Sequence, residues 1–492
     1  MAQNFQHPIQ CIQFVKRKNG ASKGVLVASV GAKLISYAAE SGQRLADWPQ
    51  DGADKSTAND AESNPETEGP PEKKRKVDTS SEKATCVASE KKSVTFTNIP
   101  ILTSTPDGEY LVALTGEDKC IRVFQIEEDG LFQELSSRPM PKRPSAITFT
   151  DSNDILTSDK FGDVYSMPLI PSAEPRAPKA PRQEKIKKVA ATPLTVHTQR
   201  NLKSLQMQLE RAQKNPNENK DTDKPAFEYD LLLGHVSLLT DIAFVSISSR
   251  DPSSAQKRSY ILSADRDEHI RVSRGPPQAH VIENYCLGHT SFISKLCVPP
   301  FAPEFLISGG GDPYLLVWNW TTGQIIHQIP LVKQTSEEKQ VAVRGIWPAL
   351  FGPRQFILVA LDGSPTLQVF TIESNGSLTP HESLKANGNI LDLQVREDIN
   401  TLLLAVDCIR EPGSTQEWRS TPSSPATFLE AFQLKGETES PQWDTVSDTM
   451  ISTMNASGTI PVPEAGEKEK QALNNSLYSL ENLRKKQLGV DE

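Results

Sequence analysis

Long apolar stretches are missing from this 492-residue sequence, which is also poor in aromatic residues. Aromatic residues make up 6% of the chain and hydrophobic residues 37%. No apolar run reaches the length of about 20 residues that a membrane-spanning helix needs. The opening sequence MAQNFQHPIQ lacks the apolar core of a secretory signal. We therefore expect a soluble intracellular protein that does not associate with a membrane.

Cysteine is scarce, and the six cysteines follow no recognisable pattern. None belongs to a C-x-x-C pair, and none has partners at zinc-finger spacing. These observations argue against a disulfide framework and against a cysteine-based metal site. We expect reduced thiols that mostly pack in the core, and no bound metal.

Catalytic sequence motifs are absent as well. The sequence has no G-x-S-x-G, no H-E-x-x-H and no dinucleotide-binding fingerprint. The triple glycine at 309–311 lacks the following Lys-Ser/Thr of a phosphate loop, and it suits a tight hairpin better. The eight histidines are scattered, with no spacing typical of acid–base catalysis. We expect no catalytic residues and no cofactor in this chain.

What the sequence does contain is a repeated unit, an apolar strand followed by an aspartate-led hairpin and an alternating strand. The second strand ends six residues after the aspartate, most often at an aromatic residue. Four units, D-K-C-I-R-V-F, D-K-F-G-D-V-Y, D-E-H-I-R-V-S and D-P-Y-L-L-V-W, open at Asp118, Asp159, Asp267 and Asp312, and looser versions surround Asp362 and Asp407. Most of these aspartates are roughly 40 to 50 residues apart, which is typical of WD-type blades.

Two of the units also carry a Gly-His pair before the first strand, and this pair predicts a structural hydrogen-bond set. In a WD-type blade, the histidine, the turn aspartate, a strand serine and a strand-end tryptophan tie the outer loop to the hairpin. The predicted members are His289, Asp312, Ser308 and Trp318 in one blade, with His235 in the preceding blade. We assign these residues a purely structural role.

The repeats predict an all-β fold, a seven-bladed WD-repeat β-propeller over residues 1–436. A four-stranded blade cannot bury both of its faces alone, so blades stack around an axis. The predicted blades cover 5–48, 93–127, 135–169, 227–276, 281–328, 340–373 and 384–436. A closed ring would then need one blade that combines strands from both ends of the chain.

Three segments and the C-terminus fall outside this pattern. Residues 49–92 are polar and expected to be a disordered loop. Residues 170–226 form a basic insertion, with 12 Lys and Arg against 6 Asp and Glu, and residues 437–470 resemble a linker. Residues 471–492 are predicted to form an amphipathic helix and tail. Its apolar positions are Leu473, Leu477, Leu480 and Leu483, and Arg484, Lys485 and Lys486 lie near its end.

A dense basic run lies inside the acidic 49–92 loop. Lys73, Lys74, Arg75 and Lys76 are flanked by proline and valine, which is typical of a nuclear import signal read by an importin. The alternative is a solvated run of charge. We favour import, and we expect the protein in the nucleus.

The string S-A-D-R-D-E-H-I-R-V-S at 263–273 differs from the other repeats. Alternation along its strand puts His269, Arg271 and Ser273 on one face, and Ser273 stands where an aromatic residue is expected. Arg266 and Glu268 fall in the preceding turn, where we expect them to be exposed. One interpretation is a docking patch for an acidic partner. The other is an ordinary WD strand, since Arg122 occupies a similar position in an earlier unit.

Four segments resemble the WD-repeat, non-catalytic subunit of the eukaryotic tRNA (guanine-N7)-methyltransferase. They are LLGHVSLLTDIAF, YILSADRDEHIRVSR, ENYCLGHTSFISKLCV and LISGGGDPYLLVWNWTTG. The similarity is densest over 229–325, and DKFGDVY at 159–165 and the C-terminal SLYSLENLRKKQLG support it. The segments 49–92 and 170–226 match poorly.

The resemblance implies a heterodimer. A separate subunit would bind S-adenosylmethionine and methylate a guanosine in tRNA, while this chain would stabilise and preorganise that subunit. The family's docking surface surrounds the corresponding string, so the resemblance implies partner contacts from Arg266, Asp267, Glu268, His269 and Arg271. Contact with tRNA would be indirect, or would consist of weak phosphate contacts from the basic insertion and the C-terminal helix.

Two rival functions remain open from the sequence. Propellers that serve as substrate receptors of ubiquitin ligases often carry W-D-x-R after a blade strand, and this sequence has Trp318-Asn319-Trp320-Thr321 at that place. A propeller enzyme would need carboxylates or histidines that converge on the central channel, and no spacing indicates them.

Overall fold

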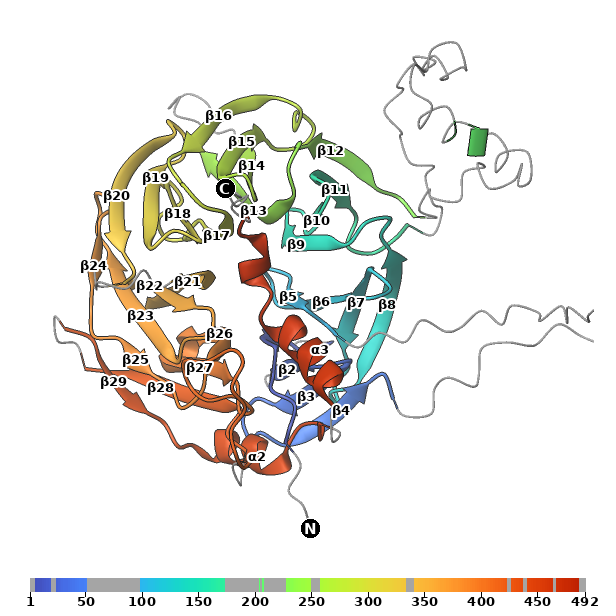
Figure 1. Ribbon diagram of the computed structural model, residues 1–492, viewed down its shortest axis with the longest axis vertical. Helices are drawn as coiled ribbons and strands as arrows, with labels where there is room; N and C mark the ends of the chain where they lie inside the picture. The colour runs from blue at the N-terminus through green and yellow to red at the C-terminus, as the bar shows by residue number, and fades with distance from the viewer. Residues whose placement is uncertain are drawn as a thin grey trace, which may run out of the picture.

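The computed structural model describes residues 5–18, 24–50, 98–172, 227–248, 257–332, 340–422, 426–436, 440–462 and 466–485, together with residues 203, 206 and 207. Seven antiparallel sheets surround a central axis (Figure 1), so the predicted seven-bladed β-propeller is confirmed. The predicted loop 49–92 and the basic insertion 170–226 lie almost entirely outside the described residues, and the basic run 73–76 lies wholly outside them.

Each blade follows chain order from the axis outward. Blade 1 consists of β1 (Cys11–Val15), β2 (Val25–Val30), β3 (Lys33–Ala38) and β4 (Arg44–Trp48), and blade 2 of β5 (Ile101–Ser104), β6 (Tyr110–Thr115), β7 (Cys120–Ile126) and β8 (Phe132–Pro139). Blade 3 consists of β9 (Pro144–Phe149), β10 (Ile155–Asp159), β11 (Asp163–Met167) and β12 (Asp230–Gly234), and blade 4 of β13 (Leu239–Ser248), β14 (Lys257–Asp265), β15 (His269–Arg274) and β16 (Ile282–Leu287).

Blades 5 to 7 complete the ring. Blade 5 consists of β17 (Ile293–Cys297), β18 (Phe305–Gly310), β19 (Tyr314–Asn319) and β20 (Gln324–Pro330). Blade 6 consists of β21 (Val343–Phe351), β22 (Arg354–Leu361), β23 (Thr366–Ile372) and β24 (Leu378–Pro380), and the short β25 (Leu384–Lys385) also pairs with β23. Blade 7 consists of β26 (Ile390–Arg396), β27 (Thr401–Val406), β28 (Leu429–Lys435) and β29 (Gln442–Thr445).

The core lies between the blades. One cluster joins Ile307 and Val317 of blade 5 to Ile357 and Val359 of blade 6, and all four side chains are fully buried. The middle strands are buried on both faces, as in β18, where all six residues are buried. This explains why the middle strands read as continuous apolar runs in the sequence.

The outer strands were the part of the fold that the sequence predicted least well. The predicted boundary at 127 leaves β8 outside blade 2, and the predicted start at 227 assigns β12 to the wrong blade, because β12 pairs with β11 of blade 3. The basic insertion therefore lies within blade 3, between its third and fourth strands. A break in composition marks a long loop here and not a change of blade.

Five of the six cysteines lie within the described residues. All five are free thiols, and Cys120, Cys286, Cys297 and Cys408 are buried. Within the same part of the chain, no helix is both long and apolar enough to cross a membrane.

Ring closure differs from the prediction, because none of the seven blades, as far as the structure describes them, combines strands from both chain ends. Instead, the inner strand of blade 7 meets that of blade 1 directly. The Ile12 backbone N–H donates to Asp392 Oδ2 at 2.9 Å, and the Phe14 N–H donates to Gln394 Oε1 at 3.1 Å. These side chains supply the connection that a shared blade would have given.

The predicted linker 437–470 is also wrong, because this segment completes the closure. It contains β29 and the helix α2 (Thr449–Ser457), whose Met450, Ile451 and Met454 are buried in a cluster shared by blades 1 and 7. Beyond α2 the chain pairs with the N-terminal segment, where the His7 N–H donates to the Ile460 carbonyl at 2.8 Å. Residues 437–470 were predicted to be a linker because their apolar content is low, although Met450, Ile451 and Met454 fill the junction between blades 1 and 7.

A half-buried carboxylate at this junction, that of Asp392, makes the stability of the fold depend on pH. Burial raises the pKa of Asp392 from 3.8 to about 6, although hydrogen bonds from the Ile12 and Leu393 backbones oppose the rise. The Asp392 carboxylate therefore binds a proton more tightly in the folded protein than in the unfolded chain. The contribution of Asp392 to the free energy of unfolding is thus largest below about pH 4 and falls as the pH rises to about 6.

We expect Asp392→Asn to remove this dependence while keeping an oxygen that accepts from Ile12. Relative to the variant, the wild type should lose up to about 3 kcal/mol between about pH 4 and about pH 7. Urea unfolding of both proteins across that range measures the difference. Parallel stability profiles for the two proteins would contradict the prediction.

Candidate docking surface

The predicted WD hydrogen-bond set is present in blade 5. His289 Nδ1 lies 2.7 Å from Asp312 Oδ2, and its Nε2 lies 2.7 Å from Ser308 Oγ. Trp318 Nε1 donates to the same serine oxygen at 2.8 Å. All four residues are buried, so they fix the loop before β17 against the β18–β19 hairpin.

Blade 4 uses the same device with a different aspartate. His235 Nε2 lies 2.8 Å from Ser263 Oγ, and its Nδ1 lies 3.4 Å from Asp265 Oδ2. The aspartate repeat predicted Asp267 as the turn aspartate of this blade. In the structure Asp265 has that role. Burial alone would raise the pKa of Asp265, but hydrogen bonds from His235 and the His269 backbone hold it below its usual value.

Asp265 also shapes the turn that follows it, which we call the docking hairpin (residues 265–269). Its Oδ1 accepts hydrogen bonds from the backbone N–H groups of Asp267 at 2.9 Å and His269 at 3.1 Å. Glu268 adopts a left-handed conformation with φ of 75°. A turn held in this way by a buried carboxylate has little freedom left to lose on binding.

Three of the predicted docking residues lie at the surface of this hairpin. The side chains of Asp267 and His269 are 46% and 51% exposed, and that of Glu268 is 33% exposed. The structure therefore brings two carboxylates and one imidazole together at the tip. Arg266 is half-buried, and its backbone N–H donates to the Leu238 carbonyl at 2.9 Å.

Arg271 does not face outward, which corrects the sequence prediction. Its Nε donates to Ser273 Oγ at 2.9 Å, and its Nη1 donates to the Gly234 carbonyl of blade 3 at 3.0 Å. The residue is 9% exposed, and burial lowers the pKa of its guanidinium. Ser273 occupies the register position of Trp318, so the small serine leaves room for Arg271 between two blades.

The C-terminal segment, which we call the C-terminal strap (residues 466–485), crosses one face of the ring to reach the docking hairpin (Figure 1). Its helix α3 (Glu467–Leu477) begins earlier and ends sooner than predicted, and Leu480 and Leu483 belong to the 3-10 turn η4 (Leu480–Leu483). The four leucines therefore do not form one continuous helical stripe.

Polar contacts anchor the strap over blades 6 and 7. Tyr478 Oη donates to Asp407 Oδ2 at 2.6 Å, and Arg344 Nη1 donates to the Leu477 carbonyl at 2.9 Å. Asn474 is buried and accepts from Arg410 Nε at 2.8 Å. These contacts fix the path of the strap over the axis.

The end of the strap contacts blades 4 and 5. Arg484 Nη2 donates to the Val341 carbonyl at 2.9 Å, and Arg266 Nε donates to the Leu483 carbonyl at 2.7 Å. Lys485 Nζ lies 3.2 Å from Asp267 Oδ1 and 3.0 Å from Glu268 Oε1. Two motifs that are far apart in the sequence, the hairpin string and the basic C-terminus, thus form one surface.

Exposed apolar side chains lie on the outer strands and turns of the neighbouring blades 3, 4 and 5, and we call this group the apolar rim. Its members are Phe161, Leu231, Val236, Ile282, Tyr285, Leu287, Ile325 and Ile326, on β12, β16, β20 and adjoining turns. Leu287 is 60% exposed and lies opposite His269 in the β15–β16 register. Among the described residues, the outer strands β4, β8, β24 and β29 carry no exposed large apolar side chain. A patch of this kind is typical of an interaction site.

The apolar rim was not predicted from the sequence, although a signal was present. The outer strand β16 reads I-E-N-Y-C-L, and Cys286 is its only buried residue. An outer strand with one buried position does not need three further large apolar residues for folding. That excess could have pointed to a contact with another protein.

Comparison with known proteins agrees with this architecture. Residues 26–432 match the family described as "tRNA methyltransferase TRM82 WD40 domain". Two relatives, from Aspergillus oryzae and Coccidioides immitis, are both named tRNA (guanine-N(7)-)-methyltransferase non-catalytic subunit. The first is 51% identical and covers 99% of both chains. The second is 40% identical and covers 95% of this chain and 96% of its own. The chain belongs to the TRM82 family of WD40-repeat proteins.

Proposed function

We propose that this chain is the non-catalytic subunit of a tRNA (guanine-N7)-methyltransferase, and that it holds a separate catalytic subunit in its active form. The observation that carries the proposal is the family match over most of the propeller, with relatives named as non-catalytic subunits. The described residues contain no group of three or more His, Cys, Asp or Glu side chains placed to hold a metal ion. We assign methyl transfer from S-adenosylmethionine to the partner, because the relatives are named as non-catalytic subunits.

The docking hairpin and the apolar rim are our candidate for the partner's binding surface. Exposed apolar side chains provide contact area, and Asp267, Glu268 and His269 provide charge and hydrogen bonds at its edge. In this proposal Arg266 and Arg271 support the hairpin without contacting the partner. Arg266 donates to the Leu483 carbonyl of the strap, and Arg271 donates to the Gly234 carbonyl of blade 3. Lys485 pairs with both Asp267 and Glu268, so the surface combines acidic and basic groups.

Preorganisation is the mechanism that we propose for the scaffold. The hairpin is held by Asp265 and by the strap before any partner binds. A rigid surface loses little conformational entropy on association, so more of the contact energy can order the partner's tRNA-binding and catalytic segments.

Leu287→Arg tests the proposal. The side chain is exposed, so the variant should fold with a free energy of unfolding within about 0.5 kcal/mol of wild type. We expect its Kd for the catalytic subunit to rise at least tenfold, which is about 1.4 kcal/mol. Methylation of unmodified tRNA should fall at limiting subunit concentration and recover when the variant is in excess.

Ile399→Arg is the matched control, because Ile399 is 46% exposed in η3 (Glu397–Ile399) of blade 7. It should leave both affinity and methylation unchanged. Equal effects of the two variants would refute the docking surface. Methyl transfer by this chain alone, without a second subunit, would refute the proposed function itself.

Nuclear import and tRNA contact remain parts of the proposal that rest on the sequence. The run Lys73, Lys74, Arg75 and Lys76 is the candidate importin signal. The basic composition of 170–226 supports a weak phosphate contact from that insertion.

A further inference from the structure

A second surface of blade 4 lies at the opposite ends of the two strands that carry the docking hairpin. There a cavity of about 420 Å³, which we call the basic pocket, is lined by residues 257–260 of β14 and 274–278 of β15 and the turn after it. Three of these residues, Lys257, Arg258 and Arg274, are cations, and none of the described residues that line the pocket is acidic. This placement stands out in a chain whose net charge is −9.

The pocket exists because β14 extends beyond its neighbour. The last residue pair between β14 and β15 is Tyr260 with Arg274, while β13 stays paired with β14 as far as Lys257. Within the described part of the chain, one edge of β14 therefore has no strand beside it at Lys257 and Arg258. The turn after β15 closes the other wall, where the Gly275 N–H donates to the Ser259 carbonyl at 2.7 Å.

Gly275 is needed for this close approach. A Cβ atom at position 275 would lie 2.1 Å from Ser259 Oγ, so a larger residue would push the turn away from the strand. The hydroxyl groups of Ser259 and Tyr260 and the amide of Gln278 add neutral polar groups to the lining. The turn is thus set by backbone geometry, and the lining combines three cations with three neutral polar side chains.

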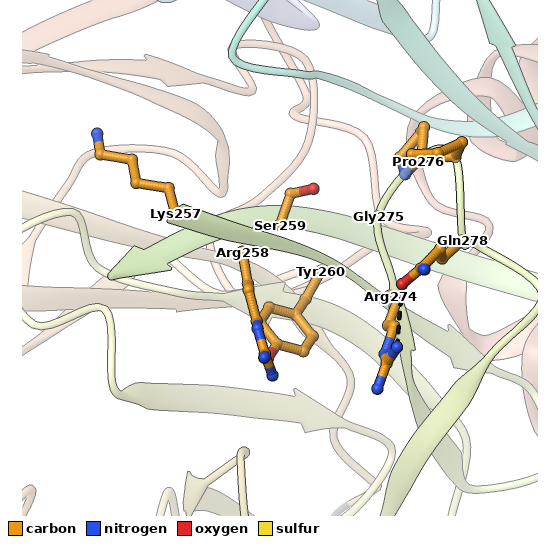
Figure 2. A pocket seen from close by; sticks show the side chains of 9 residues that line it. Lys257, Arg258, Ser259, Tyr260, Arg274, Gly275, Pro276 and Gln278 are labelled. Carbon is orange, nitrogen blue, oxygen red and sulfur yellow. Dashed lines mark hydrogen bonds between the residues drawn. The ribbon is translucent and has the colours of Figure 1, made fainter. Parts of the chain in front are cut away.

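The cations project to both sides of the strand end. Figure 2 shows the side chains of Arg258 and Arg274 extending to the same side, while Lys257 extends to the other. Glu283 pairs with Arg274, whereas Lys257 and Arg258 are both exposed. Cations spread along an edge in this way suit a chain of anionic groups better than one small anion.

We infer that the basic pocket binds the phosphodiester backbone of RNA. Arginine suits phosphate because its guanidinium can donate two parallel hydrogen bonds, and lysine can neutralise the next phosphate along the chain. The choice of RNA as the anionic chain rests on the proposed function, because a tRNA methyltransferase binds tRNA. The nine residues of β14 span about 27 Å, so RNA bound to a subunit at the docking hairpin need extend only that far to reach the pocket.

The test is the double variant Lys257→Glu/Arg258→Glu, assayed as the full chain alone and as the complex with the catalytic subunit. The probe is an unmodified tRNA transcript in a binding titration at several salt concentrations. We expect affinity to fall about tenfold at low salt, and the slope of log K against log salt to decrease by about 1.8, which corresponds to two lost phosphate contacts. Binding of the catalytic subunit should not change, so failure of this inference is separate from failure of the proposed function.

Lys119→Glu/Lys385→Glu is the matched control, with the same change in charge at two exposed lysines, one in the turn between β6 and β7 and one in β25. It should change tRNA affinity by less than about twofold. The milder Lys257→Gln/Arg258→Gln variant should lose an intermediate amount of tRNA affinity. It keeps the test valid if the double glutamate variant does not fold. Equal losses in the test and control pairs, or none in the test pair, would overturn the inference. So would loss of binding to a polyglutamate peptide with unchanged tRNA affinity.

Discussion

Replacing Asp407 by alanine is expected to lower the free energy of unfolding by about 3 to 5 kcal/mol. Asp407 and Arg410 are both fully buried, and Arg410 Nη1 lies 2.9 Å from Asp407 Oδ2. Without the carboxylate, a guanidinium remains inside the protein. Among the described residues, its remaining strong acceptor is Asn474, and the aromatic rings of Trp418 and Tyr478 lie beside it. An uncompensated buried charge of this kind is among the most destabilising changes known.

The same substitution should release the C-terminal strap, because Asp407 also accepts the hydrogen bond from Tyr478 Oη at 2.6 Å. Urea unfolding measures the loss of stability, and limited proteolysis measures release of the strap. Tyr478→Phe is the control for the second effect, since it removes one hydroxyl and should cost only about 1 kcal/mol. The double variant Asp407→Ala/Arg410→Met should recover part of the loss. A double variant less stable than Asp407→Ala would contradict the charge argument.

The Asp407 pair also explains how far the sequence could predict the hairpins. The aspartate repeat located the connection between the second and third strands in six blades, because a turn aspartate beside an apolar strand is a local pattern. Five of these connections are short, and Asp407 begins a longer one that ends at β28. The partners of these aspartates are not local. His289 meets Asp312 in blade 5, whereas Arg344 meets Asp362 in blade 6 and Arg410 meets Asp407 in blade 7. Blades with arginine in this role have no Gly-His pair, so they look incomplete in the sequence although their aspartate is held equally well.

The candidate site was predictable as a location but not as a set of roles. The unusual string at 263–273 did mark the docking hairpin, because a missing aromatic residue and a cluster of charges are visible in one segment. Whether Arg271 faces solvent depends on the Gly234 carbonyl of the neighbouring blade, which periodicity within one strand cannot show. The contact of Lys485 with Asp267 joins residues more than 200 positions apart. Only the folded ring defines such a contact.

Trp318→Ala is the second change with a large expected effect, a loss of about 3 to 5 kcal/mol. The indole is fully buried between blades 4 and 5 and donates to Ser308 Oγ, so alanine would leave a cavity and one lost hydrogen bond. Trp318→Phe keeps a ring in that space and should cost less, about 1 to 3 kcal/mol. Urea unfolding measures both variants. An alanine variant within about 1 kcal/mol of wild type would show that neighbouring side chains close the cavity.

Blade 4 suggests a rescue for the same site, because its own sequence replaces this tryptophan by a serine and an arginine. Ser273 and Arg271 correspond in register to Trp318 and Leu316, and the Gly234 carbonyl that accepts from Arg271 corresponds to that of Gly288. Trp318→Ser alone should be as destabilising as Trp318→Ala. If the arginine fills the space as it does in blade 4, adding Leu316→Arg should restore at least about 1 kcal/mol through the new hydrogen bonds. A double variant less stable than Trp318→Ser would contradict this expectation. It would show that the arginine of blade 4 fits only the junction between blades 3 and 4, where Ser273 and Arg271 support the docking hairpin.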